Sequence, residues 1–115
     1  MTRHVLLLDL VDDAALIAAY RDAHRPGGVP AAVLAEIRAS GILDMEIWQV
    51  GDRLVMIMTT DATYDPTARS ARLATDPALR MWEDAMSRLQ RPLPAASSGV
   101  KWIEAARIFD LGEHA

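Results

Sequence analysis

The middle of the chain carries the segment that decides the fold, DMEIWQVGDRLVMIMTT, residues 44–60. Its first part alternates imperfectly between polar and apolar residues, and its last part is apolar from Leu54 to Met58. Two such runs, separated by a short turn that contains glycine, are typical of a β-hairpin. The segment therefore predicts antiparallel strands over Asp44–Val50 and Arg53–Thr60, joined by Gly51-Asp52.

The segments on either side add helices and strands to this hairpin. A nearly continuous apolar run predicts an opening strand that is covered on both faces. Helix starts are marked by Asp12-Asp13 before the first helix and by Asp76-Pro77 before the last. The expected elements, in order, are a strand over Arg3–Val11, helices over Ala14–His24 and Ala31–Ser40, the hairpin, helices over Thr67–Thr75 and Ala78–Gln90, and a strand over Trp102–Leu111.

The order of these elements, β-α(α)-β-β-α(α)-β, predicts the α+β class. It is the ferredoxin-like βαββαβ arrangement, an antiparallel four-stranded sheet with helices on one face. The other face needs a cover, because a large exposed apolar face is unfavourable, and a second copy of the chain is the usual cover. We therefore expect a homodimer of the dimeric α+β barrel type, in which two sheets face each other around an interior cavity.

Composition narrows the class of protein. A chain of 115 residues, 51% of them hydrophobic, is expected to form a single domain over residues 1–115. The chain has no cysteine, which fits a reducing compartment, and no apolar run approaches the roughly 20 residues of a membrane span. The net charge is −4, the arginines are scattered and aromatic residues make up 5%, so nucleic-acid binding is not expected. We expect a cytoplasmic protein that does not bind membranes.

Tyr20 and His24 are the first candidates for chemistry. They are four residues apart near the end of the first predicted helix, so their side chains share one helical face. An imidazole beside a phenol can bind a hydroxylated ligand and move its protons, because the pKa of histidine lies near pH 7. The structural alternative is that both residues belong to the edge of the core, with their polar tips bonded to the backbone.

Other motifs exclude several kinds of site. His4, His24 and His114 show no metal-ligand spacing, so we expect no metal site. The glycines Gly27-Gly28 do not follow a strand and open a helix, as a dinucleotide or phosphate loop would, and no G-x-S-x-G elbow is present. Methionines such as Met45 and tryptophans such as Trp82 are more often core residues than ligand platforms, although sugars do stack on aromatic faces.

Further segments, taken together, have a familiar order and spacing. They are the opening strand, AYRDAHRP at 19–26, GILDMEIW at 41–48, RLVMIM at 53–58, MWE at 81–83, and GVKW at 99–102 leading to ARIF at 106–109. Over nearly its whole length the chain resembles the L-rhamnose mutarotase family, which includes L-fucose mutarotase-like members. The DMEIW and ARIF segments are especially similar to the L-fucose-type branch.

The resemblance implies roles for single residues. His24 matches the catalytic proton donor of the family, and Tyr20 matches its substrate-binding tyrosine. Trp82 matches the second member of a tryptophan pair that lines the sugar site, and Met81 stands in place of the first. Met45 stands in place of a further substrate-binding tyrosine on the second strand.

The resemblance further implies a cofactor-free dimeric enzyme that interconverts sugar anomers. Our hypothesis is an isomerase, an aldose mutarotase for a 6-deoxy-L-hexose such as L-fucose or L-rhamnose, which opens and closes the sugar ring by proton transfer. His24 would be the acid/base and Tyr20 would orient a hydroxyl, while the methyl group and apolar face of the sugar would contact Met45, Met81 and Trp82. The loop at residues 27–30 departs from the usual Ile-Trp-Pro-Glu of the family, so the identity of the sugar stays open.

Three points remain open at this level. The partner base can be Asp22, Glu46 or a water. One alternative function is a cofactor-independent monooxygenase or haem-degrading enzyme of the same barrel type, which would consume oxygen or give a haem spectrum. Another is a non-catalytic ligand-binding dimer, and a shared fold does not separate these functions.

Overall fold

The computed structural model of the protein describes residues 1–97 and 99–114. The described chain contains strands and helices in the predicted alternation, followed by a single 3-10 turn. The elements are β1 (Thr2–Leu10), α1 (Ala14–His24), α2 (Ala31–Ala39), β2 (Ile42–Val50), β3 (Arg53–Thr60), α3 (Pro66–Thr75), α4 (Pro77–Ser87), β4 (Gln90–Arg91), β5 (Ile103–Glu104) and the 3-10 turn η1 (Leu111–Glu113).

The sheet is antiparallel and is built around β1. The strand order is β2-β3-β1-β4, and β5 also pairs with β1. β1 pairs with β3 along nearly its whole length, from Thr2 opposite Thr60 to Asp9 opposite Arg53. β4 and β5 pair with β1 on its outer side, at Asp9–Leu10 and at Leu6–Leu7 respectively. The expected α+β fold with an antiparallel sheet is therefore confirmed.

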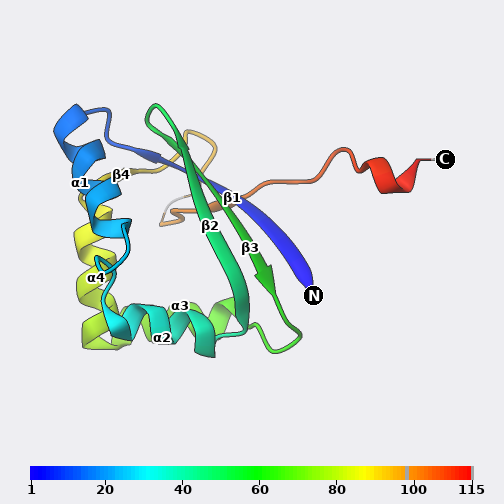
Figure 1. The fold of residues 1–115 in the computed structure, drawn as a ribbon, viewed down its shortest axis with the longest axis horizontal. Coiled ribbons are helices and arrows are strands. Elements are labelled where there is room, and N and C mark those ends of the chain that lie inside the picture. The colour runs from blue at the N-terminus through cyan, green and yellow to red at the C-terminus, as the bar shows by residue number, and fades with distance from the viewer. Residues whose placement is uncertain (98, 115) are drawn as a thin grey trace.

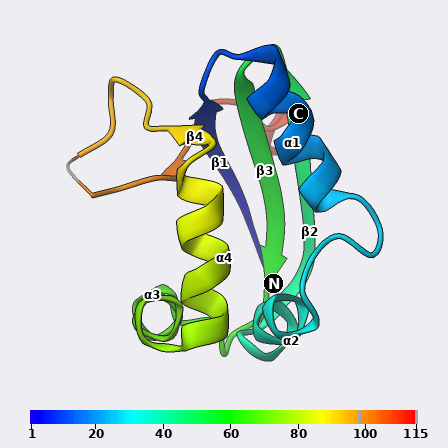
Figure 2. The same cartoon turned by 90° about the vertical axis from the view of Figure 1, so that its left-hand side faces the viewer.

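All four α-helices lie on one face of this sheet. Figure 1 shows α1 near one end of the strands, α2 and α3 near the other, and α4 running from α3 toward β4. Figure 2, which looks from the helix side, shows the helices in front of the strands. No helix of the described residues lies on the opposite face of the sheet, as the sequence predicted.

The register shows which side chains share a face. Ile47, Met56 and Leu6 stand opposite one another in neighbouring strands, and all three line a cavity on the helix side. Successive side chains of a strand point to opposite faces. The next row, from β2 to β5, therefore points to the uncovered face. It consists of Trp48, Val55, Leu7 and Ile103.

The core lies between the helix side of the sheet and helices α1 and α4. Leu8, Leu10 and Leu54 have at most 1% of their surface exposed. Leu10 and Leu54 form one cluster with Tyr20 of α1 and Met86 of α4. Full burial of an aliphatic side chain stabilises the fold by roughly 1.5–3 kcal/mol, so this cluster fixes α1 and α4 against the sheet.

Capping aspartates define the helix starts. The Asp13 carboxylate accepts a hydrogen bond from the Leu16 amide at 3.0 Å, and Asp65 and Asp76 cap α3 and α4 in the same way. Each cap satisfies a backbone amide that has no partner inside the helix. α1 has the bounds that the sequence predicted, and α2 and α3 agree within one residue. α4 ends at Ser87, three residues before the predicted end, because Gln90 pairs with Leu10 in the sheet.

The hairpin turn also follows the prediction. Val50 stands opposite Arg53, so the loop has two residues, and Gly51 has a φ of 57°. A glycine with positive φ at the first loop position is typical of a II′ turn, whose twist matches that of the two strands.

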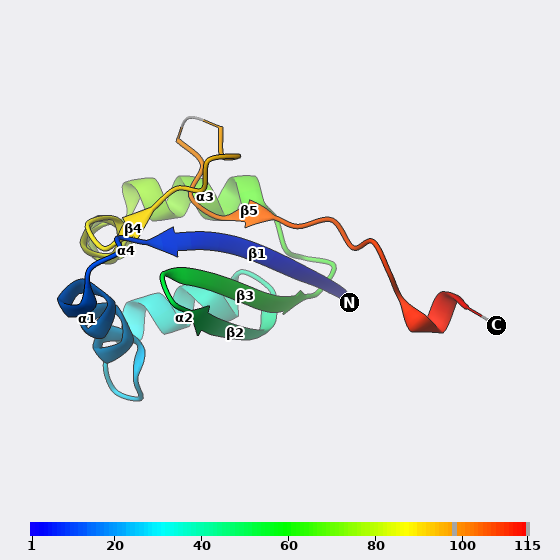
Figure 3. The ribbon, with the colours of Figure 1, turned by 90° about the horizontal axis from the view of Figure 1, so that it is seen from above.

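The prediction of one long last strand over Trp102–Leu111 was wrong. Only Ile103–Glu104 is a strand, and the Ala105 amide still bonds to the Val5 carbonyl at 2.7 Å. Residues 106–110 are extended but pair with no other strand of the described chain. Figure 3 shows this segment leaving the body of the molecule beyond the N-terminal end of β1. The sheet also has five strands rather than four, because β4 is too short to leave a pattern in the sequence.

Within the described residues, none of the helices has the length and apolar character to cross a membrane.

Candidate active site

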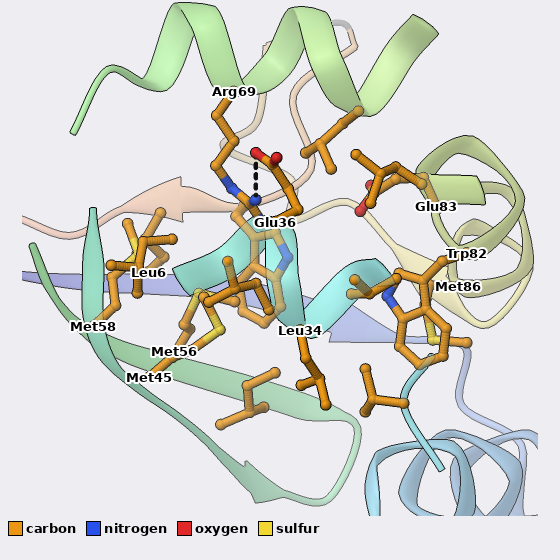
Figure 4. Close-up of a pocket in the computed structure, with 18 of the residues that line it drawn as sticks. Leu6, Leu34, Glu36, Met45, Met56, Met58, Arg69, Trp82, Glu83 and Met86 are labelled. Carbon is orange, nitrogen blue, oxygen red and sulfur yellow. Dashed lines mark hydrogen bonds and ion pairs between the residues drawn. The ribbon is translucent and has the colours of Figure 1, made fainter. Parts of the chain in front are cut away.

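A cavity of about 730 Å³ lies between the sheet and the helices of a single chain. Figure 4 shows Leu6, Met45, Met56 and Met58 of the strands on one side of it and Trp82, Glu83 and Met86 of α4 on another. The cavity is therefore on the helix side of the sheet. It is enclosed by residues of a single protomer.

Tyr20 and His24 line this cavity together, as predicted. Both come from the last turns of α1, and their ring centroids are 4.2 Å apart with an interplanar angle of 30°. Tyr20 is 4% exposed and packs into the core cluster with Leu10 and Leu54. The core therefore fixes the phenol, and the phenol in turn supports the imidazole.

The hydrogen bond of His24 defines its tautomer. Its Nδ1 lies 2.7 Å from the Tyr20 carbonyl oxygen, one helical turn earlier. A carbonyl oxygen only accepts, so Nδ1 carries the proton and Nε2 carries a lone pair. Among the described residues, Nε2 has no hydrogen-bond partner. The available nitrogen of the neutral ring is thus a base.

Burial shifts the pKa values of His24 and Tyr20. It lowers the pKa of His24 below its ordinary value of 6.5, and the hydrogen bond to the Tyr20 carbonyl only partly opposes this shift. His24 is therefore neutral at pH 7. Burial also raises the pKa of Tyr20 to about 12, an effect that the neighbouring Gln90 amide opposes in part. Tyr20 keeps its proton at pH 7 and can donate a hydrogen bond.

Trp82 and Met45 also lie at the cavity, as predicted. The Trp82 ring meets the His24 ring edge-on, with centroids 5.3 Å apart and an angle of 65°. Met45 lies on β2 opposite Met58, and both line the cavity. An indole and thioethers form an apolar wall that suits the C–H face and the methyl group of a deoxy sugar.

Met81 is placed differently. It lies on α4 beside Trp82, but its side chain is 74% exposed and is not part of the cavity wall. Adjacent residues of a helix point about 100° apart, and here Trp82 faces the cavity while Met81 points to solvent. The substrate contact of Met81 stays a prediction without support from the single chain.

The proposed partner bases are also elsewhere. Asp22 pairs with Arg25 at 3.2 Å, and Glu46 accepts a hydrogen bond from Trp48 Nε1 at 2.8 Å. Neither residue lines the cavity, whereas the carboxylates of Glu36, Asp44 and Glu83 do. Glu36 pairs with Arg69 at 3.5 Å, as Figure 4 shows, and Glu83 pairs with Lys101 at 3.3 Å.

The cavity wall includes residues that sequence reasoning did not name as part of the site, among them Gln90 and Trp102. Gln90 Oε1 is buried without a hydrogen-bond partner among the described residues. Gln90 lies in β4 and Trp102 directly precedes β5, two strands of two residues that are too short to show a periodicity. Trp102, like Trp82, was interpreted as more often a core or interface residue than a ligand platform, and it was not named as a site residue.

The three histidines lie at separate places. His4 bonds to Glu104 and to Thr60 Oγ1, the latter at 3.1 Å, and His114 stacks on Phe109 with ring centroids 5.0 Å apart. In residues 1–97 and 99–114, no three histidine, aspartate or glutamate side chains are grouped as metal ligands would be.

A second cavity, of about 590 Å³, lies between the end of α1 and the β2–β3 turn. It shares Tyr20 and His24 with the first, and Arg21, Arg25, Trp48 and Gln49 complete much of its wall. The Tyr20–His24 pair is therefore bordered by cavities on two sides.

Comparison with known proteins finds relatives over almost the whole chain. The L-rhamnose mutarotase family model matches residues 3–111. An L-fucose mutarotase of Xanthomonas campestris pv. campestris is 50% identical over 113 residues, which cover 98% of this chain and 90% of that protein.

Solved structures add information on the fold. An L-rhamnose mutarotase of Formosa agariphila superposes with a TM-score of 0.69 over 96% of this chain and 99% of that chain, at 15% identity. The tetracenomycin F2 cyclase of Streptomyces glaucescens, a type-II polyketide cyclase, superposes with a TM-score of 0.55 over 96% and 98%, at 13% identity. At these identities both likenesses concern the fold alone. With a family model over almost the whole chain and a half-identical relative, the chain belongs to the L-rhamnose mutarotase family, whose members are isomerases acting on carbohydrates.

Proposed function

We propose that this chain is an aldose mutarotase that interconverts the α and β anomers of a 6-deoxy-L-hexose, with L-fucose as the first candidate and L-rhamnose as the second. One observation carries the proposal: an imidazole on the cavity wall has Nδ1 engaged and Nε2 without a partner, beside a buried phenol and an indole. L-Fucose comes first because the half-identical relative is an L-fucose mutarotase.

In the proposed mechanism, His24 moves one proton between two oxygens of the sugar. Nε2 takes the proton from the anomeric hydroxyl as the C1–O5 bond breaks and C1 becomes an aldehyde carbon. The imidazolium then gives its proton to O5, which leaves as a hydroxyl. Both oxygens are bonded to C1, so a single imidazole can reach both in turn. After rotation about C1–C2, the same steps in reverse close the ring to either anomer.

This sequence includes the proton-donor role that the resemblance implies. His24 begins as a base because burial keeps it neutral, and it becomes the donor once it holds the proton of the sugar. Tyr20, whose pKa of about 12 keeps it protonated, would donate a hydrogen bond to a sugar hydroxyl. Trp82 and Met45 would contact the apolar side of the ring. Met81 would reach a sugar only if its exposed side chain turned inward.

We also propose that the active form is a homodimer. The uncovered sheet face carries the apolar row Trp48, Val55, Leu7 and Ile103, and Trp48 is 61% exposed in the single chain. A contiguous apolar face of this kind typically marks an interaction surface. The cytoplasmic location remains a prediction from the sequence.

The test is saturation-transfer NMR between the anomers of L-fucose, of L-rhamnose and of D-glucose as a control sugar. We expect the chain to accelerate exchange of at least one of the two 6-deoxy sugars in proportion to its concentration, and D-glucose much less. Exchange at the uncatalysed rate for all three sugars would contradict the proposed mutarotase activity. Sugar binding without accelerated exchange would favour the alternative of a non-catalytic ligand-binding dimer.

A further inference from the structure

Gln90 is a cavity residue to which the proposed mechanism gives no role. It lies in β4, opposite Leu10 of β1, and so shares the helix side of the sheet with that buried leucine. The residue before it is fixed at both backbone polar groups. The Leu89 carbonyl accepts a hydrogen bond from the Val11 amide, and the Leu89 amide donates one to the Met86 carbonyl, both at 2.9 Å. The Gln90 side chain therefore reaches the cavity from an anchored strand.

The side chain of Gln90 carries one oxygen that is not paired. Oε1 is buried and has no hydrogen-bond partner within residues 1–97 and 99–114. Almost every buried polar atom of a native protein has such a partner, because an unpaired one costs folding free energy. Gln90 lines the cavity that holds Tyr20 and His24. A ligand in this cavity is therefore a source of the missing donor.

The nitrogen of the same amide already has a neighbour. Burial raises the pKa of Tyr20 to about 12, and the Gln90 amide opposes part of this rise, as a donor to the phenol oxygen does. A hydrogen bond from the amide to the phenol oxygen leaves the phenol proton free to be donated elsewhere. Gln90 and Tyr20 together thus offer one acceptor and one donor to the cavity.

The carboxylates of the cavity wall are placed differently from this amide oxygen. Glu36 pairs with Arg72 at 2.9 Å, and Glu83 pairs with Lys101 at 3.3 Å. Asp44 lines the cavity but is exposed to solvent. Gln90 differs from them because its acceptor is buried, uncharged and without a partner. Such an acceptor suits an uncharged hydroxylated ligand.

We propose that Gln90 is a sugar-binding residue, whose Oε1 accepts a hydrogen bond from one hydroxyl of a 6-deoxy-L-hexose while Tyr20 donates one to a neighbouring sugar oxygen. Adjacent ring hydroxyls can each donate and accept, so they match a donor and an acceptor held side by side. An amide oxygen cannot donate, so the site requires a hydroxyl at that ring position and disfavours a sugar without one. The role of Gln90 rests on the proposed mutarotase function for its class of substrate.

The first experiment measures the dissociation constant of L-fucose by isothermal titration calorimetry. Methionine has nearly the length of glutamine but no amide, so Gln90→Met should bind L-fucose about tenfold more weakly. In anomeric exchange, KM should rise by a similar factor and kcat should change by less than about threefold, because the hydrogen bond is present in the ground state and the transition state alike.

The stability of the variant separates a binding role from a structural one. The urea midpoint of Gln90→Met should stay close to that of wild type, since the loss of an unpaired buried oxygen offsets the loss of the amide beside Tyr20. Arg88→Met is the matched control, because Arg88 is exposed and lines neither cavity, and it should bind L-fucose as wild type does. Wild-type affinity in Gln90→Met would overturn the binding role, and a lowered urea midpoint with that affinity would make the amide structural.

The second experiment identifies the hydroxyl. Each of the analogues of L-fucose that lack a single hydroxyl is titrated against wild type and against Gln90→Met. For one analogue we expect the two chains to bind equally, because it lacks the hydroxyl that Oε1 accepts from. A variant that weakens every analogue as much as L-fucose would contradict the hydrogen bond. If Gln90→Met does not fold, the wild-type chain still provides a test, since analogues that all bind as tightly as L-fucose would also contradict it.

The titrations need no turnover, so the two proposals can fail separately. Accelerated anomeric exchange without a hydroxyl that depends on Gln90 would remove the role of this residue and leave the mutarotase activity. A hydroxyl that depends on Gln90 without accelerated exchange would keep the sugar contact and remove the mutarotase activity. No binding of L-fucose to the wild-type chain would overturn the contact proposed for Gln90.

Discussion

The two faces of the sheet are built from the same strands, but one is covered by helices and the other is not. On β2, Ile47 points to the helices and packs against the core cluster, whereas the adjacent Trp48 points to the uncovered face and is 61% exposed. On the helix side the chain has closed its own core and formed a cavity. On the other side it offers apolar rows that it does not cover. A period of two in the sequence thus separates the face that forms the cavity from the face that we propose associates with a second copy.

The largest effect is expected on the helix side, in His24→Ala. The general acid–base contribution is typically 10²–10⁴-fold, so kcat for anomeric exchange should fall by about that factor. The fold should remain, because the variant removes only one partly buried ring at the end of α1. His114→Ala changes a histidine that directly follows the 3-10 turn and does not line the cavity. It is the matched control and should keep full activity. Equal losses in the two variants would mean that exchange does not depend on the cavity histidine.

The core of the helix side should tolerate truncation poorly. Leu54→Ala removes a side chain that is 1% exposed and should lower the free energy of unfolding by about 2–5 kcal/mol. Trp48→Ser, on the uncovered face, should change the unfolding free energy of the monomer by about 0.5 kcal/mol or less but weaken the dimer. Urea unfolding at low protein concentration measures the free energy of unfolding of both variants. Similar losses of unfolding free energy in the two variants would contradict the distinction between a core face and an uncovered face.

Asp9, on the uncovered face, contributes to the stability of the fold. The hydrogen bond from Arg53 holds the pKa of this buried carboxyl below its usual value of 3.8. A depressed carboxyl pKa contributes stability that is present above the unfolded value and is lost as pH falls through the folded value. Asp9→Asn should therefore cost about 1–3 kcal/mol at pH 7, with less further loss on acidification than in wild type. Chemical unfolding at pH 7 and at pH 3 checks this, and a variant as stable as wild type at pH 7 would contradict it.

The smallest expected effect separates binding from proton transfer within the site. Tyr20→Phe removes one neutral hydrogen-bond donor, worth about 0.5–1.5 kcal/mol. KM for the sugar should rise by up to about tenfold, with kcat changed much less than in His24→Ala. A loss in kcat as large as that of His24→Ala would make the phenol a proton-transfer group.

The sequence was most informative where structure is local. The aspartate caps, the Gly51 turn and the apolar strands predicted α1, the hairpin and β1 closely, because each is set by neighbouring residues. It was least informative about β4 and β5, which are two residues long and exist only because β1 offers its outer edge. The ARIF segment is apolar enough to predict a strand, but it pairs with no other strand of the described chain.

The same division applies to the site. Tyr20 and His24 were predictable because helical spacing brings them together, and Trp82 and Met45 through the family resemblance. Gln90 and Trp102 reach the cavity through tertiary packing, which leaves no pattern in the chain. Met81 was assigned a role because it aligns with a site residue of the family. Its backbone on α4 lies beside the cavity, but its side chain points to solvent.

The most direct test of the central claim is the pH dependence of catalysed anomeric exchange of L-fucose between about pH 5 and about pH 8, corrected for the uncatalysed rate. Since burial lowers the pKa of His24 and the neutral ring must take the first proton, kcat/KM should rise with pH to a plateau, with a midpoint below 6.5. The rise should vanish in His24→Ala. A rate that falls over this range, or a profile that His24→Ala leaves intact, would contradict a neutral His24 as the group that shuttles the proton.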